Sequence, residues 1–214
     1  MIKSGNAIPV SVIRRLPKYL THIELLGEKG GQWVSSRQLA EALGLTSSTV
    51  RQDLSWLDFS GISKRGYEIE PLERVLSGVL GLTRGRKAIV IGAGNLGRAL
   101  VLHEEFARRG FHICGIFDAD PALGGEAVGQ LHVQGMEELQ REVKLKQIDI
   151  GIIAVPASAA QNVADQLTAA GVRGILNLAC AHVAGPDTIP VVDARMIESL
   201  QELTCAIKIQ TENK

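Results

Sequence analysis

The sequence predicts a two-domain protein in which a small helical domain precedes an α/β domain built on a doubly wound parallel sheet. Three observations lead to this fold class. Two capped helices joined by a glycine turn lie between residues 34 and 59. An apolar run at residues 87–91 leads directly into the pattern G-x-G-x-x-G. From there to residue 192, apolar strands alternate with helical segments, which is typical of parallel sheets with helices on both faces.

Composition bounds the class of protein. The 214 residues are 45% hydrophobic and 21% charged, with no net formal charge. Residues 1–85 carry 11 Lys and Arg against 8 Asp and Glu, whereas the remainder carries 12 against 15. A positive N-terminal part suits contact with a polyanion. The three cysteines are widely spaced and no apolar run approaches about 18 residues, which predicts a cytoplasmic protein without a disulfide framework, zinc site, export signal or membrane span.

The first domain begins with helical patterns that carry clear start and stop signals. A helical pattern runs over residues 8–26, where Pro17 predicts a kink or a restart. Ser35 and Gln38 have the spacing of a capping box, and Gly44 stands where a left-handed residue ends a helix. These signals predict a helix between residues 35 and 44.

The second helix of the pair, expected at residues 47–59, presents two faces. Thr46 caps its start, and its inner stripe consists of Val50, Leu54 and Leu57. Arg and Gln on the outer face can read guanine and adenine in the major groove, and residues 63–69 predict a basic hairpin wing. A solvated helix face is the alternative, but the capped pair, the wing and the positive charge together favour a winged helix-turn-helix. We expect the DNA contacts at Arg15, Ser48, Arg51, Gln52, Ser55, Lys64, Arg65 and Tyr67.

A helix opened by Pro71 and a linker at residues 81–86 precede the glycine pattern, each position of which has a physical reason. Gly92 allows a tight turn, Gly94 lets the backbone approach a pyrophosphate, and Gly97 lets the next helix pack on the strand. Asp118 closes the following strand 21 residues after Gly97, where a carboxylate binds a ribose 2′-hydroxyl and repels a 2′-phosphate. We therefore expect NAD(H) rather than NADP(H), with a structural turn that binds no ligand as the alternative.

The rest of the chain predicts strands at residues 149–155, 174–178 and 189–192, with a helix at residues 136–144 and another ended by Gly171. Dinucleotides lie at the carboxyl ends of such strands, so residues 154–157 and 177–179 are further candidates. A last helix from about residue 193 either packs on its own domain or pairs across a dimer. The expected cofactor contacts are Gly92, Ala93, Gly94, Asn95, Leu96, Gly97, Asp118, Ala154, Val155, Pro156 and Asn177.

A winged helix joined to a dinucleotide-binding domain by a helical linker resembles the Rex family of redox-sensing transcriptional repressors. The resemblance covers nearly the whole chain and rests on motifs in the family order. They lie at residues 15–17 (RLP), 34–36 (VSS), 50–55 (VRQDLS), 92–97 (GAGNLG), 117–121 (FDADP), 155–157 (VPA) and 174–177 (GILN).

The resemblance implies a homodimer that binds an AT-rich palindromic operator and leaves it when NADH displaces NAD+. The dinucleotide is then a ligand, with no catalytic residue and no metal, and its different affinity for two dimer arrangements provides the coupling. The resemblance also implies that the C-terminal helix is exchanged between subunits. We expect a winged-helix domain with its linker helix at residues 1–81, a Rossmann domain at 86–192 and the dimerisation helix at 193–214.

Four places depart from the family pattern. The recognition helix has Gln52 where the family has lysine, and Ile62 and Ser63 replace the paired arginines of the wing. His103 stands where the family has a tyrosine and Arg195 where it has an aspartate, both in sensing contacts that cross between subunits. The alternatives are therefore a paralogue with an altered ligand or operator response, a dinucleotide-binding dimer without DNA, and a dehydrogenase-like enzyme. An enzyme would draw on His103, His132, His182 or Cys180.

Overall fold

The computed structural model describes residues 8–212, which form two compact units, one ending at Arg84 and the other beginning at Gly85. Each unit has its own hydrophobic core. Among the described residues, no helix is both long enough and apolar enough to cross a membrane.

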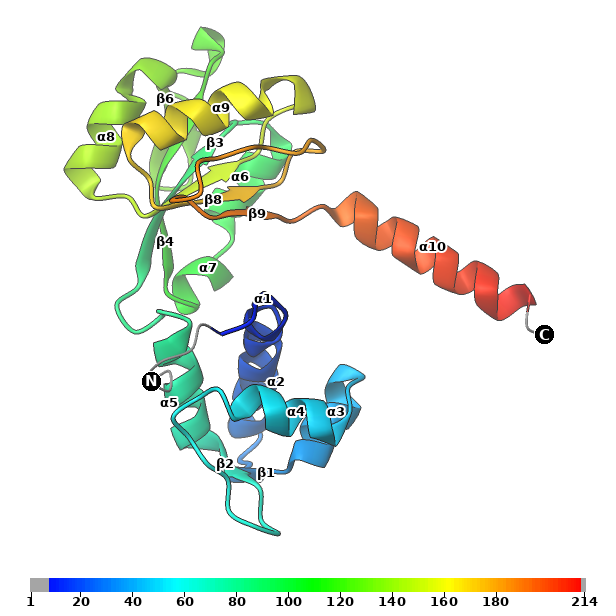
Figure 1. The fold of residues 1–214 in the computed structure, drawn as a ribbon. Helices are drawn as coiled ribbons and strands as arrows, with labels where there is room; N and C mark the ends of the chain where they lie inside the picture. Colours follow the sequence, from blue (N-terminus) through cyan, green and yellow to red (C-terminus); the bar gives the residue numbers. More distant parts are fainter. Residues whose placement is uncertain (1–7, 213–214) are drawn as a thin grey trace. The chain divides into compact units, whose positions relative to one another are not determined.

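The N-terminal unit combines short helices with a two-stranded antiparallel sheet (Figure 1). Its elements are α1 (Val10–Ile13), α2 (Leu16–Glu28), β1 (Trp33–Val34), α3 (Ser36–Leu43), α4 (Ser47–Leu54), β2 (Tyr67–Glu68) and α5 (Ile69–Val79). The expected restart at Pro17 is confirmed, because Pro17 lies in the first turn of α2. The capping box of Ser35 and Gln38 is present, and Gly44 ends α3 with φ of 64°. The sequence therefore determined these helix ends locally.

The predicted end of α4 and the predicted wing both need correction. The helix ends at Leu54 rather than residue 59, and tighter turns follow, in which Trp56 N donates to Asp53 O and Leu57 N donates to Leu54 O. The hairpin is shorter than predicted, because only Ile62 and Gly66 form an antiparallel bridge, in which the N–H of each donates to the carbonyl oxygen of the other. Beyond this bridge, β2 pairs with β1, which precedes α3.

The core of the N-terminal unit confirms the inner stripe of α4. Val50, Leu54 and Leu57 are each no more than 1% exposed and pack in one cluster with α2, α3 and α5. Leu57 stays buried beyond the helix end because the turns after Leu54 keep its side chain on the same side. The stripe thus predicted burial correctly even where it extended past the helix.

The C-terminal unit is a seven-stranded sheet with the order β5-β6-β4-β3-β7-β8-β9. All neighbouring strands are parallel except β5 and β6. The strands are β3 (Arg86–Ile91), β4 (Phe111–Asp118), β5 (Ala127–Val128), β6 (Leu131–Gly135), β7 (Ile150–Ile153), β8 (Gly174–Asn177) and β9 (Val191–Asp193). The chain winds outward from β3 to β6 and then returns to β7 and continues to β9, which confirms the doubly wound sheet.

Helices cover both faces of this sheet. They are α6 (Asn95–Leu102), α7 (Glu105–Arg108), α8 (Leu139–Lys146) and α9 (Ala157–Ala170), with 3-10 turns at Pro121–Leu123 and Met136–Glu138. In β3, Ile89 and Ile91 pack in the core shared with α8 and α9, whereas Ala88 and Val90 pack in the cluster that includes residues of α6. Figure 1 shows where these helices lie against the sheet. Burial on both faces explains why β3 is a continuous apolar run. Helix α7 and the hairpin of β5 and β6 were not predicted, because these elements are too short to show a periodic pattern.

The last helix, α10 (Met196–Glu212), begins three residues later than expected because Asp193 still pairs with Asn177 in the parallel ladder. None of its side chains is buried. Met196, Leu200, Leu203 and Ile207 recur at helical spacing and are each more than half exposed. This apolar stripe has no partner within the described residues of one chain.

Candidate functional site

In the glycine-rich turn between β3 and α6, the packing of the protein itself requires a glycine at two of the three positions. Gly92 has φ of 107°, and a Cβ there would collide with the carbonyl oxygen of Ala154 at the end of β7. A Cβ on Gly97 would collide with the carbonyl oxygen of Gly92. These contacts match the reasons expected from the sequence, a tight turn and a close helix–strand approach.

Gly94 differs, because nothing inside the described chain requires a glycine there. Its φ is −73°, which any residue adopts, and a Cβ would meet no atom within 4 Å. It is the N-cap residue of α6 and supplies no side-chain cap. The start of α6 therefore presents uncapped N–H groups beside open space, which is the arrangement that binds a phosphate group.

The backbone N–H and the carbonyl oxygen of Ala93 each form a hydrogen bond with a side chain. Ala93 N donates to Asp118 Oδ2 at 2.6 Å, and Ala93 O accepts from Arg98 Nε at 2.6 Å. Arg98 also forms an ion pair with Glu126, in the loop before β5. Asp120 N donates to the other oxygen of Asp118 at 2.9 Å. Asp118 thus lies against the glycine-rich turn as predicted from its spacing, whereas the support from Arg98 and Glu126 had no sequence signal beyond the position of Arg98 directly after Gly97.

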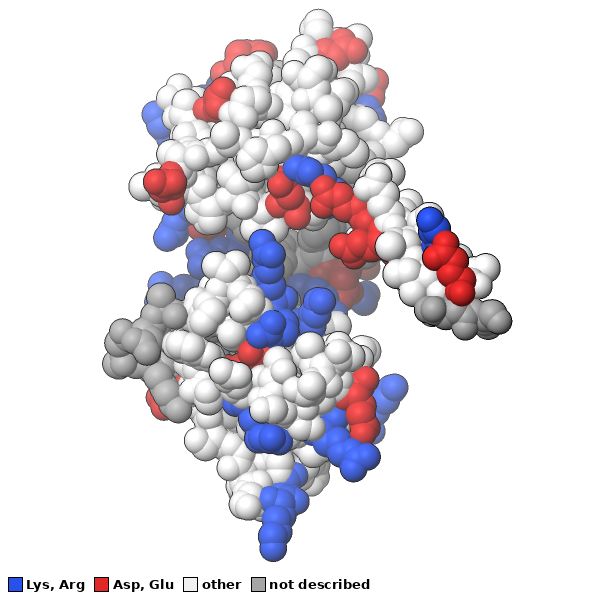
Figure 2. Space-filling model, turned by 45° about the vertical axis from the view of Figure 1, so that its right-hand side comes forward, with Lys and Arg blue, Asp and Glu red and all other residues white. Residues whose placement is uncertain are grey.

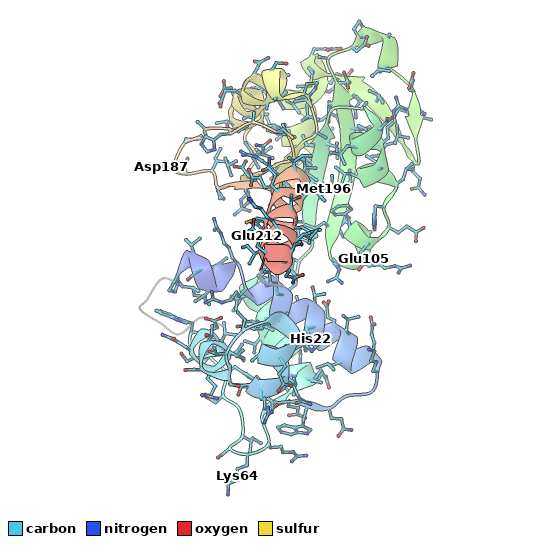
Figure 3. The ribbon with its side chains drawn as sticks, turned by 90° about the vertical axis from the view of Figure 1, so that its right-hand side faces the viewer. His22, Lys64, Glu105, Asp187, Met196 and Glu212 are labelled. Atoms are coloured by element: carbon cyan, nitrogen blue, oxygen red, sulfur yellow. The ribbon has the colours of Figure 1, made fainter. Side chains whose placement is uncertain are left out.

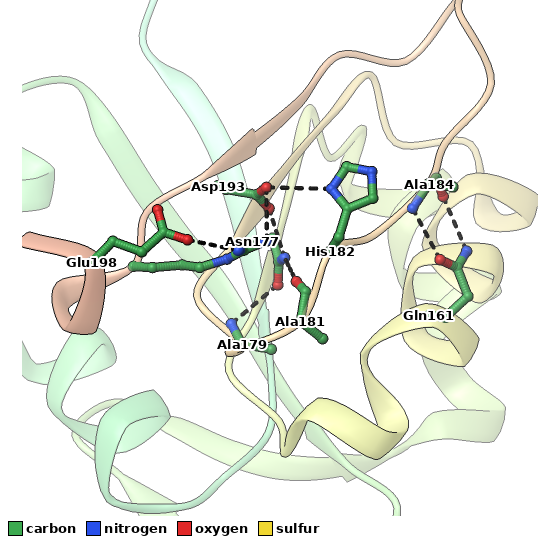
Figure 4. A network of polar contacts seen from close by, with 9 residues as sticks. Gln161, Asn177, Ala179, Ala181, His182, Ala184, Asp193 and Glu198 are labelled. Atoms are coloured by element: carbon green, nitrogen blue, oxygen red, sulfur yellow. Dashed lines mark hydrogen bonds and ion pairs between the residues drawn. The ribbon is translucent and has the colours of Figure 1, made fainter. Parts of the chain in front are cut away.

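The remaining predicted cofactor residues lie at the same edge of the sheet but differ in what they offer. Ala154, Val155 and Pro156 follow β7, and Ala154 N donates to Ile91 O at 2.8 Å. Asn177 ends β8 and is 0% exposed. Its Nδ2 donates to Ala181 O and Asp193 Oδ1, and its Oδ1 accepts from Ala179 N (Figure 4). The Asn177 amide is therefore already engaged inside the protein and holds the edge of the sheet together.

His103 and Arg195 are not brought together within the described chain. His103 ends α6, and its ring meets the Phe106 ring edge-on at 5.7 Å. Arg195 instead pairs with Asp193 and Glu198. Anywhere in residues 8–212, no group of three or more His, Cys, Asp or Glu residues is placed to hold a metal ion.

The outer face of α4 is open to solvent as the sequence predicted. Ser48, Arg51, Gln52 and Ser55 are all exposed. A groove of about 420 Å³ lies beside this face, lined by residues that include Ser35, Ser36, Arg51, Lys64 and Tyr67. Arg51 Nη1 donates to Ser36 Oγ at 3.3 Å. Lys and Arg side chains gather on the viewed face of the N-terminal unit (Figure 2).

The turn between α4 and β2 carries the other basic candidates. Lys64 is exposed at the tip of this turn and has φ of 63° (Figure 3). The Arg65 guanidinium stacks on the Trp33 ring, with Cζ 3.9 Å from the ring centroid. Tyr67 is only half-buried, and burial raises the pKa of its hydroxyl. The stacking on Trp33 orients Arg65 from β1, a contact that spacing did not predict.

Arg15 requires a revised interpretation. Its Nε and Nη2 donate to the two oxygens of Asp53 at 2.6 and 2.7 Å, and Tyr19 OH donates to Asp53 Oδ2 at 2.7 Å. Asp53 is 2% exposed. Burial, followed by the hydrogen bond to Asp53, raises the pKa of Tyr19. Arg15 thus joins the start of α2 to α4, and Asp53 and Tyr19 complete this contact without having had a sequence signal.

Comparisons with known proteins agree with this two-part architecture. The family model described as "Putative DNA-binding protein N-terminus" matches residues 7–55, and the model described as "CoA binding domain" matches residues 83–181. The crystal structure of RSP in complex with β-NAD+ and operator DNA has a TM-score of 0.89 and 34% identity, covering 97% of this chain and 95% of that one. The structure of RSP with β-NADH has a TM-score of 0.87 and 34% identity, covering 98% and 100%.

Two bacterial relatives share one name. The redox-sensing transcriptional repressor Rex of Streptomyces avermitilis is 41% identical over 93% of this chain and 78% of its own length. The Rex repressor of Clostridium perfringens strain SM101 is 38% identical over 94% of this chain and 95% of its own length. Because both the winged-helix unit and the glycine-rich turn lie within these alignments, the chain belongs to the Rex family of redox-sensing transcriptional repressors.

Proposed function

We propose that this protein is a transcriptional repressor that senses the ratio of NADH to NAD+, binds an operator as a homodimer and releases it when NADH binds. The observation that carries the proposal is Gly94, the uncapped start of α6, in a chain that also has an exposed recognition helix. Because nothing in the protein itself requires a glycine at position 94, we infer that a bound ligand occupies the space that a side chain would take there. The names of the relatives and the two RSP complexes support the same function.

The site residues fit a dinucleotide that has a free ribose hydroxyl. The N–H groups of Asn95, Leu96 and Gly97 would hold the pyrophosphate. Each Asp118 oxygen accepts one backbone hydrogen bond and keeps a second lone pair, which would accept from the ribose 2′-hydroxyl. The carboxylate would repel the 2′-phosphate of NADP(H) and the 3′-phosphate of coenzyme A, so we assign NAD(H) as the ligand.

On the DNA side, we assign base contacts to Arg51 and Gln52 and phosphate contacts to Ser48, Ser55 and Lys64. Arginine pairs with guanine and glutamine with adenine through the major groove. Tyr67 lines the groove beside α4, and Arg65 stacks on Trp33, so these two residues would position the turn. Arg15 holds the Asp53 carboxylate through both Nε and Nη2, so we assign it to the support of α4 rather than to a DNA contact. We also assign the protein to the cytoplasm, because the relatives named above come from bacteria, in which the DNA lies in the cytoplasm.

The exposed apolar stripe of α10 favours a homodimer in which this helix is exchanged between subunits. The C-terminal unit also has an apolar groove of about 400 Å³ on one face of the sheet, lined by residues that include Phe106, Phe111, Ile113 and Val192. Two copies would bury such surfaces together. The dinucleotide then acts as a ligand and not as a hydride carrier, because its unequal affinity for two dimer arrangements is sufficient to control DNA binding.

Selection of duplexes from a random pool by the purified protein, with and without NADH, tests this function. We expect enrichment of a palindrome that disappears when NADH is added, whereas NADPH and coenzyme A at the same concentration leave it. A palindrome that persists with NADH would keep the DNA role and contradict the switch, pointing to His103 and Arg195. No enrichment would contradict the DNA role, and oxidation of NADH with a carbonyl substrate would then favour a dehydrogenase-like enzyme.

A further inference from the structure

An ion pair joins the glycine-rich turn to the β5–β6 edge of the sheet. Arg98, in α6 directly after Gly97, donates from Nε to Ala93 O at 2.6 Å and forms an ion pair with Glu126 through Nη2. Glu126 precedes β5, and its backbone is fixed because Val133 N in β6 donates to Glu126 O at 2.9 Å. The Arg98 guanidinium is therefore held by two groups, the Ala93 carbonyl and the Glu126 carboxylate.

This ion pair lies beside the carboxylate that we assign to the ribose. Asp118 Oδ2 accepts from Ala93 N at 2.6 Å, so Asp118 and Arg98 bind the two backbone polar atoms of one residue. Among the described residues, Arg98 pairs with Glu126 and not with Asp118. A phosphate on the ribose 2′-oxygen would thus meet the Asp118 carboxylate, while the arginine that shares Ala93 with it is already paired.

The charges of this pair bear directly on the choice of dinucleotide. NADPH differs from NADH by its 2′-phosphate, and a guanidinium pairs with phosphate through charge-assisted hydrogen bonds. An unpaired Arg98 beside Asp118 would offset the repulsion of that phosphate. The side chains of Arg98 and Glu126 are 30% and 46% exposed, so both lie within reach of a bound ligand. Glu126 neutralises the one guanidinium that contacts the glycine-rich turn.

We propose that Glu126 is a specificity-determining residue that disfavours NADP(H) by keeping the Arg98 guanidinium paired. The proposal rests on the proposed function, because it concerns the dinucleotide site at Asp118. Asp118 repels the 2′-phosphate directly, whereas Glu126 acts through Arg98 by withholding a cation from it. The site therefore has two separate barriers against NADP(H), and the second depends on a contact between the start of α6 and the segment before β5.

The test replaces Glu126 by glutamine, which removes the charge and nearly keeps the shape. Fluorescence titration with NADH and with NADPH gives the ratio of their affinities, and thermal unfolding confirms that the fold is kept. For Glu126→Gln we expect the affinity for NADPH relative to NADH to rise about 5-fold, the size of one exposed ion pair. The rise should shrink as salt is added, because the pair is open to solvent.

A matched control separates this effect from the loss of any surface carboxylate. Glu105 is 43% exposed and accepts from Arg109 Nε at 2.7 Å, so its ion pair resembles that of Glu126 in exposure and geometry. It lies in α7, which leads into the amino end of β4, whereas Asp118 ends that strand. We expect Glu105→Gln to keep the wild-type ratio of affinities.

A double variant shows whether Glu126 acts through Arg98. In an Arg98→Met protein there is no guanidinium to release, so adding Glu126→Gln should leave the ratio of affinities unchanged. An equal rise with and without Arg98 overturns the proposal, because direct repulsion by Glu126 would then account for it. A ratio within about 2-fold of wild type in Glu126→Gln also overturns it. Absence of NADH binding by the wild type would instead contradict the proposed function.

Discussion

In the N-terminal unit, α4 is held by side chains that come from distant points of the chain, whereas in the C-terminal unit the glycine-rich turn combines the side chains of Asp118 and Arg98 with close approaches of backbone to backbone. Arg15 and Tyr19 reach Asp53 on α4 across more than 30 residues of sequence. The turn at residues 92–97 instead depends on backbone atoms that approach too closely for any Cβ at Gly92 or Gly97. A surface held by side chains is sensitive to loss of a partner, and a turn held by backbone is sensitive to added volume.

The largest effect should come from Arg15→Met, which leaves the buried Asp53 carboxylate without its guanidinium. Loss of one partner of a buried ion pair costs about 3–5 kcal/mol. We expect a loss of this size in the free energy of unfolding of the N-terminal unit, measured by urea denaturation, together with weaker operator binding. Tyr19→Phe should cost about 1 kcal/mol, because it removes one hydrogen bond. Equal, small losses in both variants would contradict the central position of Arg15.

Asp118→Ala should have the next largest effect, on ligand affinity rather than on DNA. Hydrogen bonds to a charged group contribute about 1.5–3 kcal/mol, so NADH binding should weaken by at least about 10-fold. NADPH binding should weaken less, since the repulsion of its 2′-phosphate disappears too. Fluorescence titration with both ligands gives the ratio of their affinities. An unchanged ratio would rule out Asp118 as the ribose contact.

Two glycine variants sharpen the comparison within one turn. Gly97→Ala should lower the free energy of unfolding of the C-terminal unit by about 1–3 kcal/mol, because its Cβ has no space. Gly94→Ala should leave that free energy unchanged or slightly higher, yet abolish most NADH binding. Thermal unfolding and NADH titration of both proteins separate the two outcomes. Tight NADH binding by Gly94→Ala would show that the ligand does not approach Gly94.

The smallest effects should arise on the exposed DNA face, where Arg51 and Lys64 differ in kind. Arg51→Ala should lower discrimination at one base position by about 1–3 kcal/mol. Lys64→Ala should weaken binding to all sequences alike and reduce the slope of log affinity against log salt by about 1. Titrations of operator and scrambled duplexes over a range of salt concentrations measure both. Uniform weakening by Arg51→Ala would reassign Arg51 to a phosphate contact.

Contacts between residues close in the sequence were predicted, whereas contacts between distant residues were not. The capping box at Ser35, the cap at Thr46 and the turn glycines were predicted correctly because each depends on atoms a few residues away. The extent of the wing was not predicted, because strand β2 pairs with β1, which lies on the other side of α3 and α4 in the sequence. The DNA contact at Arg15 stays a prediction, and the ion pair of Arg15 with the buried Asp53 had no local sequence signal.

The sequence by itself determined the fold class, the order of the domains, the position of the glycine-rich turn and the carboxylate at Asp118. These depend on periodicity and short spacings, which local sterics and hydrogen bonding translate directly into structure. Only the tertiary structure decided that the Asn177 side chain forms hydrogen bonds within the protein, that Arg98 and Glu126 support the turn, and that Arg195 links β9 to α10. Such contacts join residues whose separation in the chain is unrelated to their separation in space, so the packing of the sheet is what brings them together.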